Sequence, residues 1–337
     1  MIVVLIAYRT RGASFRWNLF FATLEHADWA WLGTSICLII LSNFGRAWRW
    51  KVMLRPLADT PGARPIGIWR LTSDTAIGLT AGVLLGRAGE VIRPYLIATQ
   101  TGLPFSSQVA VWLLERMLDL LAIVVLCAYA FIQLPGHSGR LGPGIRDLLW
   151  AGGGSLAVAG AFCLVFLFLF RDPARRAQRR VLNALSFLPE TYRERITNVL
   201  ESFSRGVEST GNRRLLAQLL GYTVLEWTVI VASTFAVFRG FSATRAFSLP
   251  DVLVLFGFVT LGSVVQLPGI GGGAQAASIV ILTGIYRIPL ETASGVTLLL
   301  WIVGSLAVVP LGLACALHEG LRWGKLKLLS AKQIMEA

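Results

Sequence analysis

Apolar segments long enough to cross a lipid bilayer recur along this chain of 337 residues. A transmembrane helix needs about 20 consecutive, mainly apolar residues. With 55% hydrophobic and 15% charged residues, the composition excludes an ordinary soluble globular domain. Five segments meet the required length: residues 29–50, 108–134, 148–170, 215–238 and 290–317. The sequence therefore predicts an all-α polytopic membrane protein, which we expect in a bacterial inner membrane.

The distribution of basic residues predicts how the chain is oriented. Lys and Arg number 31 against 18 Asp and Glu, which gives a net charge of +13. In a soluble protein this balance suggests nucleic acid, but cytoplasmic loops of membrane proteins collect Lys and Arg for topological reasons. We therefore expect no nucleic-acid partner. The Arg-rich connector 171–214 and the basic tail 318–337 are expected in the cytoplasm, and the Gly/Pro-rich loop 135–143 outside.

The first span ends in a cluster of arginine and tryptophan residues. Arg46 and Arg49 are interpreted as markers of its cytoplasmic end. Trp48 and Trp50 are interpreted as part of an aromatic belt at the membrane interface.

The residues that most often bind metals are scattered along the chain. The three histidines have no second ligand nearby, and no two cysteines form a CxxC pair. The sequence therefore predicts no metal site and no other cofactor.

Two apolar stretches are interrupted by glycine. Residues 68–103 contain GLTAGVLLGRAGEVIRP, and residues 251–287 contain LGSVVQLPGIGGGAQAA. In each, the apolar arms on either side of the break are too short to cross the bilayer. We interpret both as re-entrant hairpins of half-helices, the first entering from the cytoplasm and the second from outside.

The two halves of the chain repeat one order of elements: a span, a re-entrant pair and a span. Pairing Pro104 with Pro289 sets an offset of 185 residues, which also places Thr75 on Thr260 and Gly86 on Gly271. The repeat halves are residues 29–134 and 215–317, joined by a span and connector over 148–214. Opposite entry sides make this an inverted-topology repeat, a plan used by many secondary transporters.

Ionisable residues inside the apolar segments are the candidate site. Each costs roughly 2.5–3.5 kcal/mol at the bilayer centre unless it is paired or hydrated. One interpretation is that they neutralise one another as ion pairs. The other, compatible with the first, is that some face a hydrated cavity where an arginine binds phosphate bidentately. The candidates are Arg87, Glu90, Arg93, Glu115, Arg116, Asp119 and Glu226.

The second glycine-rich break is expected to line the same cavity. Breaking a helix leaves backbone groups that lipid cannot satisfy, so protein or water must satisfy them. The residues assigned to this part of the site are Gly269, Gly271, Gly272, Gly273 and Gln275.

The stretches RAWRWKVML, GRAGEVIRP, LPFSSQVAVWLLERMLDLLA and LPGIGGGAQ resemble, in the same order, the flippase-like transmembrane family named after lysylphosphatidylglycerol synthase. The resemblance implies a lipid-translocating membrane domain that stands alone, without the aminoacyltransferase domain of some relatives. The chain departs from the family at Gln275, where relatives often carry an acidic residue. It also departs at Trp301, where relatives often carry an arginine.

The leading hypothesis is therefore a membrane transporter that moves a phosphate-bearing or otherwise amphipathic lipid between leaflets, with membrane lipids as its partners. One alternative is a membrane-embedded lipid transferase with Glu90 or Glu115 as general base. The other is a non-catalytic partner of an envelope lipid or glycan enzyme.

The orientation can be tested by labelling single cysteines from one side of the membrane. In a background without native cysteine, residues introduced at Ser138 and Ser209 should react with an impermeant thiol reagent from opposite sides, because arginine is concentrated around only one of them. Labelling of both from the same side would contradict the orientation and the inverted repeat.

Overall fold

The computed structural model describes residues 15–133, 213–263 and 271–320, together with residues 154, 158, 160, 161, 266 and 267. The segments predicted at 148–170, 171–214 and 135–143 lie almost wholly outside these residues. The described elements are α2 (Trp17–Glu25), α3 (Trp29–Met53), a 3-10 turn (Arg55–Leu57), α4 (Ile68–Leu85), a 3-10 segment (Gly86–Val91), α5 (Ile92–Thr101), α6 (Phe105–Gln133), α10 (Arg213–Arg239), α11 (Leu249–Gly262), α12 (Gly273–Gly284), α13 (Leu290–Trp301), a π-helical turn (Ile302–Leu306) and α14 (Val309–His318).

Apart from the turns and loops that join them, the described elements are helices and one short β pair. Residues Gln266–Leu267 and Gly271–Gly272 form this antiparallel pair. Three helical segments are long and apolar enough to cross a membrane: Trp29–Met53, Arg214–Arg239 and Leu290–His318. The prediction of an all-helical membrane protein is confirmed.

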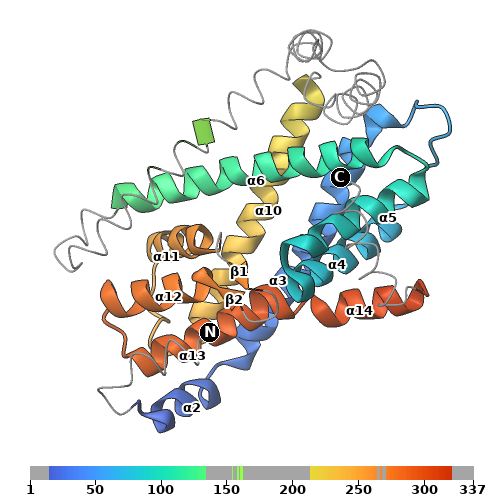
Figure 1. Ribbon diagram of the computed structural model, residues 1–337. Helices are drawn as coiled ribbons and strands as arrows, with labels where there is room; N and C mark the ends of the chain where they lie inside the picture. The colour runs from blue at the N-terminus through green and yellow to red at the C-terminus, as the bar shows by residue number, and fades with distance from the viewer. Residues whose placement is uncertain are drawn as a thin grey trace, which may run out of the picture.

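Figure 1 shows how the helices are arranged around two central ones. Helices α3 and α10 pack along each other and run through the middle of the molecule. On one side lie α4, α5 and α14, and on the other lie α11, α12 and α13, while α6 crosses over both groups. At the contact between α3 and α10, the Ser35 hydroxyl lies 2.8 Å from the carbonyl oxygen and 2.7 Å from the hydroxyl oxygen of Ser233. Small side chains with hydroxyl groups let these two helices approach closely.

The first glycine-broken stretch forms two helices, α4 and α5, joined by the 3-10 segment. Helix α4 ends at Gly86, whose φ of 68° is a left-handed conformation that only glycine adopts without strain. The two arms then pack tightly, since a Cβ placed on Gly78 would lie 2.5 Å from the Cβ of Arg93. The predicted break is therefore real, and it brings α5 against α4.

The second glycine-broken stretch also forms two packed helices, α11 and α12. A capping box between Ser248 and Asp251 starts α11. The sequence led us to expect that protein or water satisfies the backbone of this break, and Gly271 pairs with Leu267 and Gly272 with Gln266. The β pair thus satisfies part of the backbone at this point, as expected. Gly269 lies outside the described residues.

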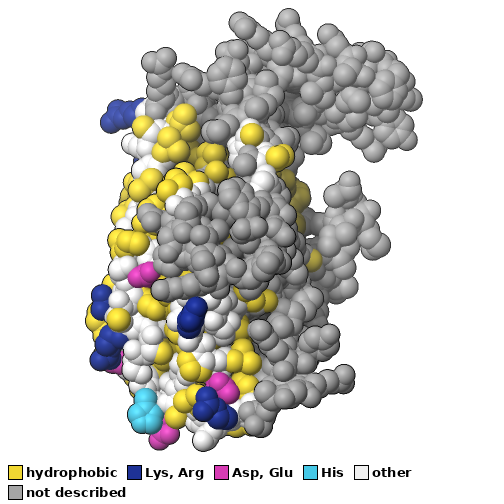
Figure 2. All heavy atoms as spheres, turned by 90° about the vertical axis from the view of Figure 1, so that its left-hand side faces the viewer, with side chains coloured by type: hydrophobic (Ala, Val, Ile, Leu, Met, Phe, Trp, Pro, Cys, Tyr) yellow, Lys and Arg dark blue, Asp and Glu magenta, His cyan; other side chains and the backbone are white. Residues whose placement is uncertain are grey.

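The outer surface is largely apolar. On the face shown in Figure 2, hydrophobic side chains cover much of the described surface, and most of the visible charged side chains lie toward its lower end. Large aromatic side chains such as Trp29 and Trp69 are exposed, Trp69 by 77%. Apolar area on this scale is typical of a surface that contacts lipid or another protein.

The close contact between α4 and α5 predicts the effect of a single methyl group. We expect Gly78→Ala to lower the free energy of unfolding by about 1–3 kcal/mol, because the new methyl overlaps the Arg93 side chain. The control is Gly33→Ala in α3, where the added carbon meets nothing within 4 Å. That change should be neutral or stabilising by up to about 1 kcal/mol. Thermal unfolding in detergent measures both, and equal stability of the two variants would contradict the predicted packing.

Candidate functional site

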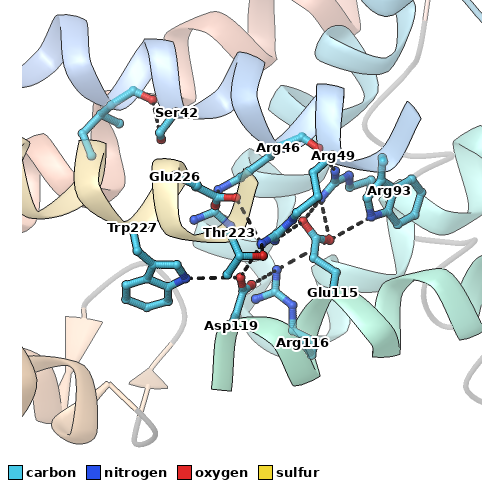
Figure 3. A network of polar contacts seen from close by, with 12 residues as sticks. Ser42, Arg46, Arg49, Arg93, Glu115, Arg116, Asp119, Thr223, Glu226 and Trp227 are labelled. Atoms are coloured by element: carbon cyan, nitrogen blue, oxygen red, sulfur yellow. Dashed lines mark hydrogen bonds and ion pairs between the residues drawn. The ribbon is translucent and has the colours of Figure 1, made fainter. Parts of the chain in front are cut away.

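Arg49 of α3 is the centre of a buried network of charges (Figure 3). Its side chain is completely buried. One terminal nitrogen lies 2.9 Å from Glu115, and the other lies 2.9 Å from Asp119 and 3.3 Å from Glu226. Glu115 and Asp119 are four residues apart on α6 and so share one face of that helix. Arg49 therefore joins α3 to both α6 and α10.

Glu115 is the carboxylate with the most partners in this network. Besides Arg49, it accepts a hydrogen bond from Arg93 of α5 at 2.9 Å and from the indole Nε1 of Trp50 at 2.9 Å. The guanidinium of Arg93 also lies over the Trp50 ring, 4.3 Å from its centroid. Such cation–π contacts strengthen when both groups are shielded from water. Both oxygens of Glu115 are thus occupied by donors.

The network ends at two arginines on its edges. Arg46 of α3 lies 2.9 Å from Glu226 through its Nε atom. Arg116 of α6 is about a third exposed and lies 3.4 Å from Asp119. Each of the three carboxylates contacts at least two arginines, and within the described residues four arginines face three carboxylates. The network therefore has more arginine than carboxylate.

The structure brings five of the predicted site residues together: Arg93, Glu115, Arg116, Asp119 and Glu226. The expectation that charges pair with one another is confirmed for these side chains. Glu226, which has no partner apparent in the sequence, is paired across helices with Arg46 and Arg49. Whether these residues act on a substrate stays a prediction.

Three of our expectations from sequence need correction or remain open. Arg49 and Trp50 were interpreted as markers of the membrane interface, but both are fully buried in the network because they are the partners that the α6 carboxylates require. Glu90 is half-buried in the 3-10 segment and has no ion pair within the described residues. For Arg87, only the backbone in the same segment is described.

A cavity of about 300 Å³ lies beside the network, between α3 and α4 of the first half and α10, α11, α12 and α13 of the second. Arg46 is the charged side chain among its described lining residues, and Ser42, Thr297, Gln275 and Trp301 also line it. The side chains of Arg93, Glu115 and Arg116 do not line this cavity. The arginine that faces the cavity is thus Arg46, which the sequence analysis had assigned to topology.

Gln275 is the amide side chain in the described cavity wall, and a hydrogen bond fixes its orientation. It is the third residue of α12, and its side-chain oxygen accepts a hydrogen bond from the backbone N–H of Gly272, which caps the helix. The side chain is 2% exposed, and its Nε2 atom has no hydrogen-bond partner within the described residues. A buried amide donor without a partner carries a desolvation cost of about 1–3 kcal/mol. An acceptor entering the cavity would remove that cost.

Comparison with protein families identifies the chain. The model of the lysylphosphatidylglycerol synthase TM region matches residues 1–312. The chain belongs to this family. Among curated proteins, the glycosyltransferase AglD of Haloferax volcanii is 26% identical over 235 residues, which cover 64% of this chain and 36% of that protein. The match thus spans about a third of the relative's length. No solved structure matches.

Gln275 and Trp301, the two positions at which we expected this chain to depart from its family, both line the cavity of this member of the lysylphosphatidylglycerol synthase TM family. They belong to the surface that an occupant of the cavity would touch.

Breaking one ion pair of the network tests how strongly the four helices depend on it. We expect Glu115→Gln to lower the free energy of unfolding by about 3 kcal/mol or more, because Arg49 and Arg93 would stay buried without full compensation. A double-mutant cycle with Arg93→Gln should give a coupling energy of about 1–3 kcal/mol.

The control for this cycle is the exposed ion pair of Arg245 with Asp28, at 3.3 Å. Arg245→Gln should change stability by less than about 1 kcal/mol, because solvent screens that pair. Additivity of Glu115→Gln and Arg93→Gln within about 0.5 kcal/mol would contradict a coupled network.

Proposed function

We propose that this protein moves a phosphate-bearing lipid between the two leaflets of the membrane, with the headgroup in the cavity beside the charge network. The observation that carries the proposal is the kind of polar group in the cavity wall. Arg46 and the Nε2 atom of Gln275 are both hydrogen-bond donors, and no Asp or Glu among the described residues lines the cavity. Glu226, which pairs with the Nε atom of Arg46, is not among the lining residues. Donors in a wall without a lining carboxylate favour an anion.

The end of helix α12 adds to this preference. Ala274 and Gln275 line the cavity and belong to the first turn of α12. The N-terminus of a helix carries a partial positive charge of roughly half an elementary charge and attracts phosphate groups. The guanidinium of Arg46, the amide of Gln275 and this helix end would together surround one phosphate.

The remaining wall suits an amphipathic molecule. Most lining residues are apolar, including Ile39, Phe256, Leu300 and Val303. A phosphate in bare hydrocarbon faces a large desolvation penalty, which a cavity with fixed donors lowers. The acyl chains can stay in the surrounding lipid while the headgroup passes, so the path needs to accommodate only the headgroup.

We also propose the inverted repeat and the re-entrant hairpins that the sequence led us to expect. At the offset of 185 residues, α3 falls on residues 214–238, next to the bounds of α10, and α6 falls on 290–318, the extent of α13 through α14. Helices α4 and α5 correspond in order to α11 and α12. These correspondences support two related halves around a shared cavity, the plan of many secondary transporters. We further propose an inner-membrane location with a cytoplasmic C-terminus.

The Haloferax volcanii relative, a glycosyltransferase by name, favours a second candidate, a membrane-embedded glycosyl or other group transferase. Such an enzyme needs a general base near its substrate. Glu115 is an unsuitable base, because both of its oxygens are held by Arg49, Arg93 and Trp50. A third candidate is a non-catalytic partner of an envelope enzyme. Transport remains the function that the cavity supports best.

Reconstitution in vesicles tests the transport proposal directly. We expect vesicles with the protein to transfer phosphatidylglycerol, labelled with a fluorophore on a short acyl chain, between leaflets without nucleotide. Arg46→Gln should slow this transfer by about tenfold or more, because a hydrogen bond to a charged group contributes about 1.5–3 kcal/mol. Gln275→Leu should slow it by less, since the lost donor is neutral.

The matched control for transport is Arg245→Gln, which removes an exposed charge that is not part of the cavity lining and should leave the rate unchanged. Soluble glycerol phosphate inside the vesicles separates a lipid headgroup from a free phosphate, because only a solute transporter would release it. Transfer equal to protein-free vesicles, or an unchanged rate in Arg46→Gln, would contradict the proposal. Attachment of a sugar to the labelled lipid would favour the transferase.

A further inference from the structure

Asp74 of α4 is a buried carboxyl group outside the charge network. It is completely buried, and among the described residues no cation lies within ion-pair distance of it. The nearest basic side chain on its own helix, Arg70, pairs instead with Glu319 at 3.1 Å. Glu319 also accepts a hydrogen bond from Ser73. Asp74 is therefore left without the compensation that every carboxylate of the network has.

The partner of Asp74 is an amide, not a charge. Gln100 of α5 donates a hydrogen bond from Nε2 to Asp74 Oδ1 at 2.9 Å. The other oxygen of each side chain, Asp74 Oδ2 and Gln100 Oε1, is buried and has no partner within the described residues. An ionised carboxylate and an amide oxygen are both acceptors only, so these two atoms cannot satisfy each other. In an ionised pair, both would remain unpaired.

A single proton removes this conflict. A protonated carboxyl group has one O–H donor, which can bind the amide oxygen while the amide N–H binds the other carboxyl oxygen. The acid and the amide then form a closed pair with two hydrogen bonds, and no charge is buried. Leaving polar atoms unpaired costs about 1–3 kcal/mol for each group, so the buried surroundings favour the protonated form.

The charged side chains on the elements around Asp74 do not neutralise it. Glu319, at the end of α14, brings a like charge, and Arg70 is engaged by it. Arg93 of α5 is held by Glu115, and the α3 arginines Arg46 and Arg49 face the network carboxylates. Glu90 of the 3-10 segment lies next to Gly82. Gly82 is eight residues beyond Asp74 on α4, which corresponds to about 12 Å along the helix axis. None of these groups supplies a counter-charge within ion-pair distance.

We propose that Asp74 is a proton-binding site that holds its proton in this conformation, shares it with Gln100, and releases it to water when α4 and α5 separate. The pair ties the two arms of the first hairpin together near their open end, far from the 3-10 segment that joins them. Separation admits water, the O–H bond of the carboxyl group breaks, and the proton passes to solvent. Return of the proton re-forms the acid–amide pair. Movement of this hairpin is thereby linked to proton concentration.

The isosteric change Asp74→Asn tests the proposal without any knowledge of the transported molecule. Asparagine presents a permanent donor to Gln100, so it imitates the protonated acid at every pH. The folded wild type holds the proton more tightly than the unfolded chain does, so its stability should fall as pH rises. Relative to Asp74→Asn, the melting temperature of the wild type should drop by about 3 °C or more between about pH 5 and about pH 8.

The control is Asp59→Asn, which makes the same change at an exposed position in the loop before α4. Its melting temperature should follow that of the wild type across the pH range. At neutral pH, the infrared difference spectrum between wild type and Asp74→Asn should contain the carbonyl band of one protonated carboxylic acid. Absence of this band, or parallel pH profiles for wild type and Asp74→Asn, would overturn the proposal.

A second variant covers the case in which Asp74→Asn does not fold. Gln100→Leu leaves the carboxyl group in place and removes its amide partner, including the Nε2 donor that an ionised Asp74 would keep. Because leucine offers a carboxylate no hydrogen-bond donor, the carbonyl band should then persist to a higher pH than in the wild type. An unchanged midpoint would show that Gln100 does not share the proton. These measurements depend on the hairpin alone, so failure of lipid transport and failure of the proton site remain distinguishable.

Discussion

The burial of Arg49 is the constraint on which the rest of the described structure depends. A guanidinium at this depth is tolerated only when carboxylates surround it, because removing one partner from a buried ion pair is strongly destabilising. Its partners come from α6 and α10, and Arg93 of α5 shares Glu115 with it. Four helices must therefore meet at one point. The apolar packing elsewhere allows many helix arrangements, while this set of charges allows few.

The same network determines what kind of cavity lies beside it. Its three carboxylates are all engaged by arginines and none of them lines the cavity, so the charged side chain that faces it among the described residues is Arg46. Arg46 belongs to both structures, since its Nε atom contacts Glu226 while its side chain lines the cavity. A ligand that binds Arg46 therefore acts on the group that also links α3 to α10. Binding and helix packing are physically coupled at this residue.

Asp74 shows the contrast between a carboxylate with cations and one without. The network carboxylates each lie against two or more arginines, whereas Asp74 lies against an amide. Tight packing keeps water from compensating it, as the contacts of Gly78 with Arg93 and of Gly312 with Thr80 indicate. Helix α4 is thus pressed between α5 and α14, and its one buried acid has a neutral partner. The network carboxylates suit a structural task, because they hold helices together through arginines. Asp74 suits the proton-binding task that we propose for it.

The sequence by itself determined the helices, their breaks and the membrane class. These features are local: apolar length sets the spans at α3, α10 and α13 through α14, and glycine at Gly86 ends α4 where the hairpin begins. It also identified five of the charged residues that needed partners, because a charge in an apolar segment is costly wherever it pairs. They are Arg93, Glu115, Arg116, Asp119 and Glu226. Family membership was likewise predictable, since ordered motifs such as GRAGEVIRP carry it.

Only the tertiary structure decided which charges meet, and which of them face the cavity. Arg46 and Arg49 carry the same sequence signal as arginines at a membrane boundary, and Asp74 stands in the sequence without any visible partner. Helices that are apolar on nearly all sides lack the periodic stripe that would reveal how each is rotated. Pairing of Arg49 with Glu115, or of Asp74 with Gln100, depends on that rotation and on contacts between distant segments. The physical reason is that side-chain composition sets the cost of burying a charge, whereas helix packing sets what it is buried against.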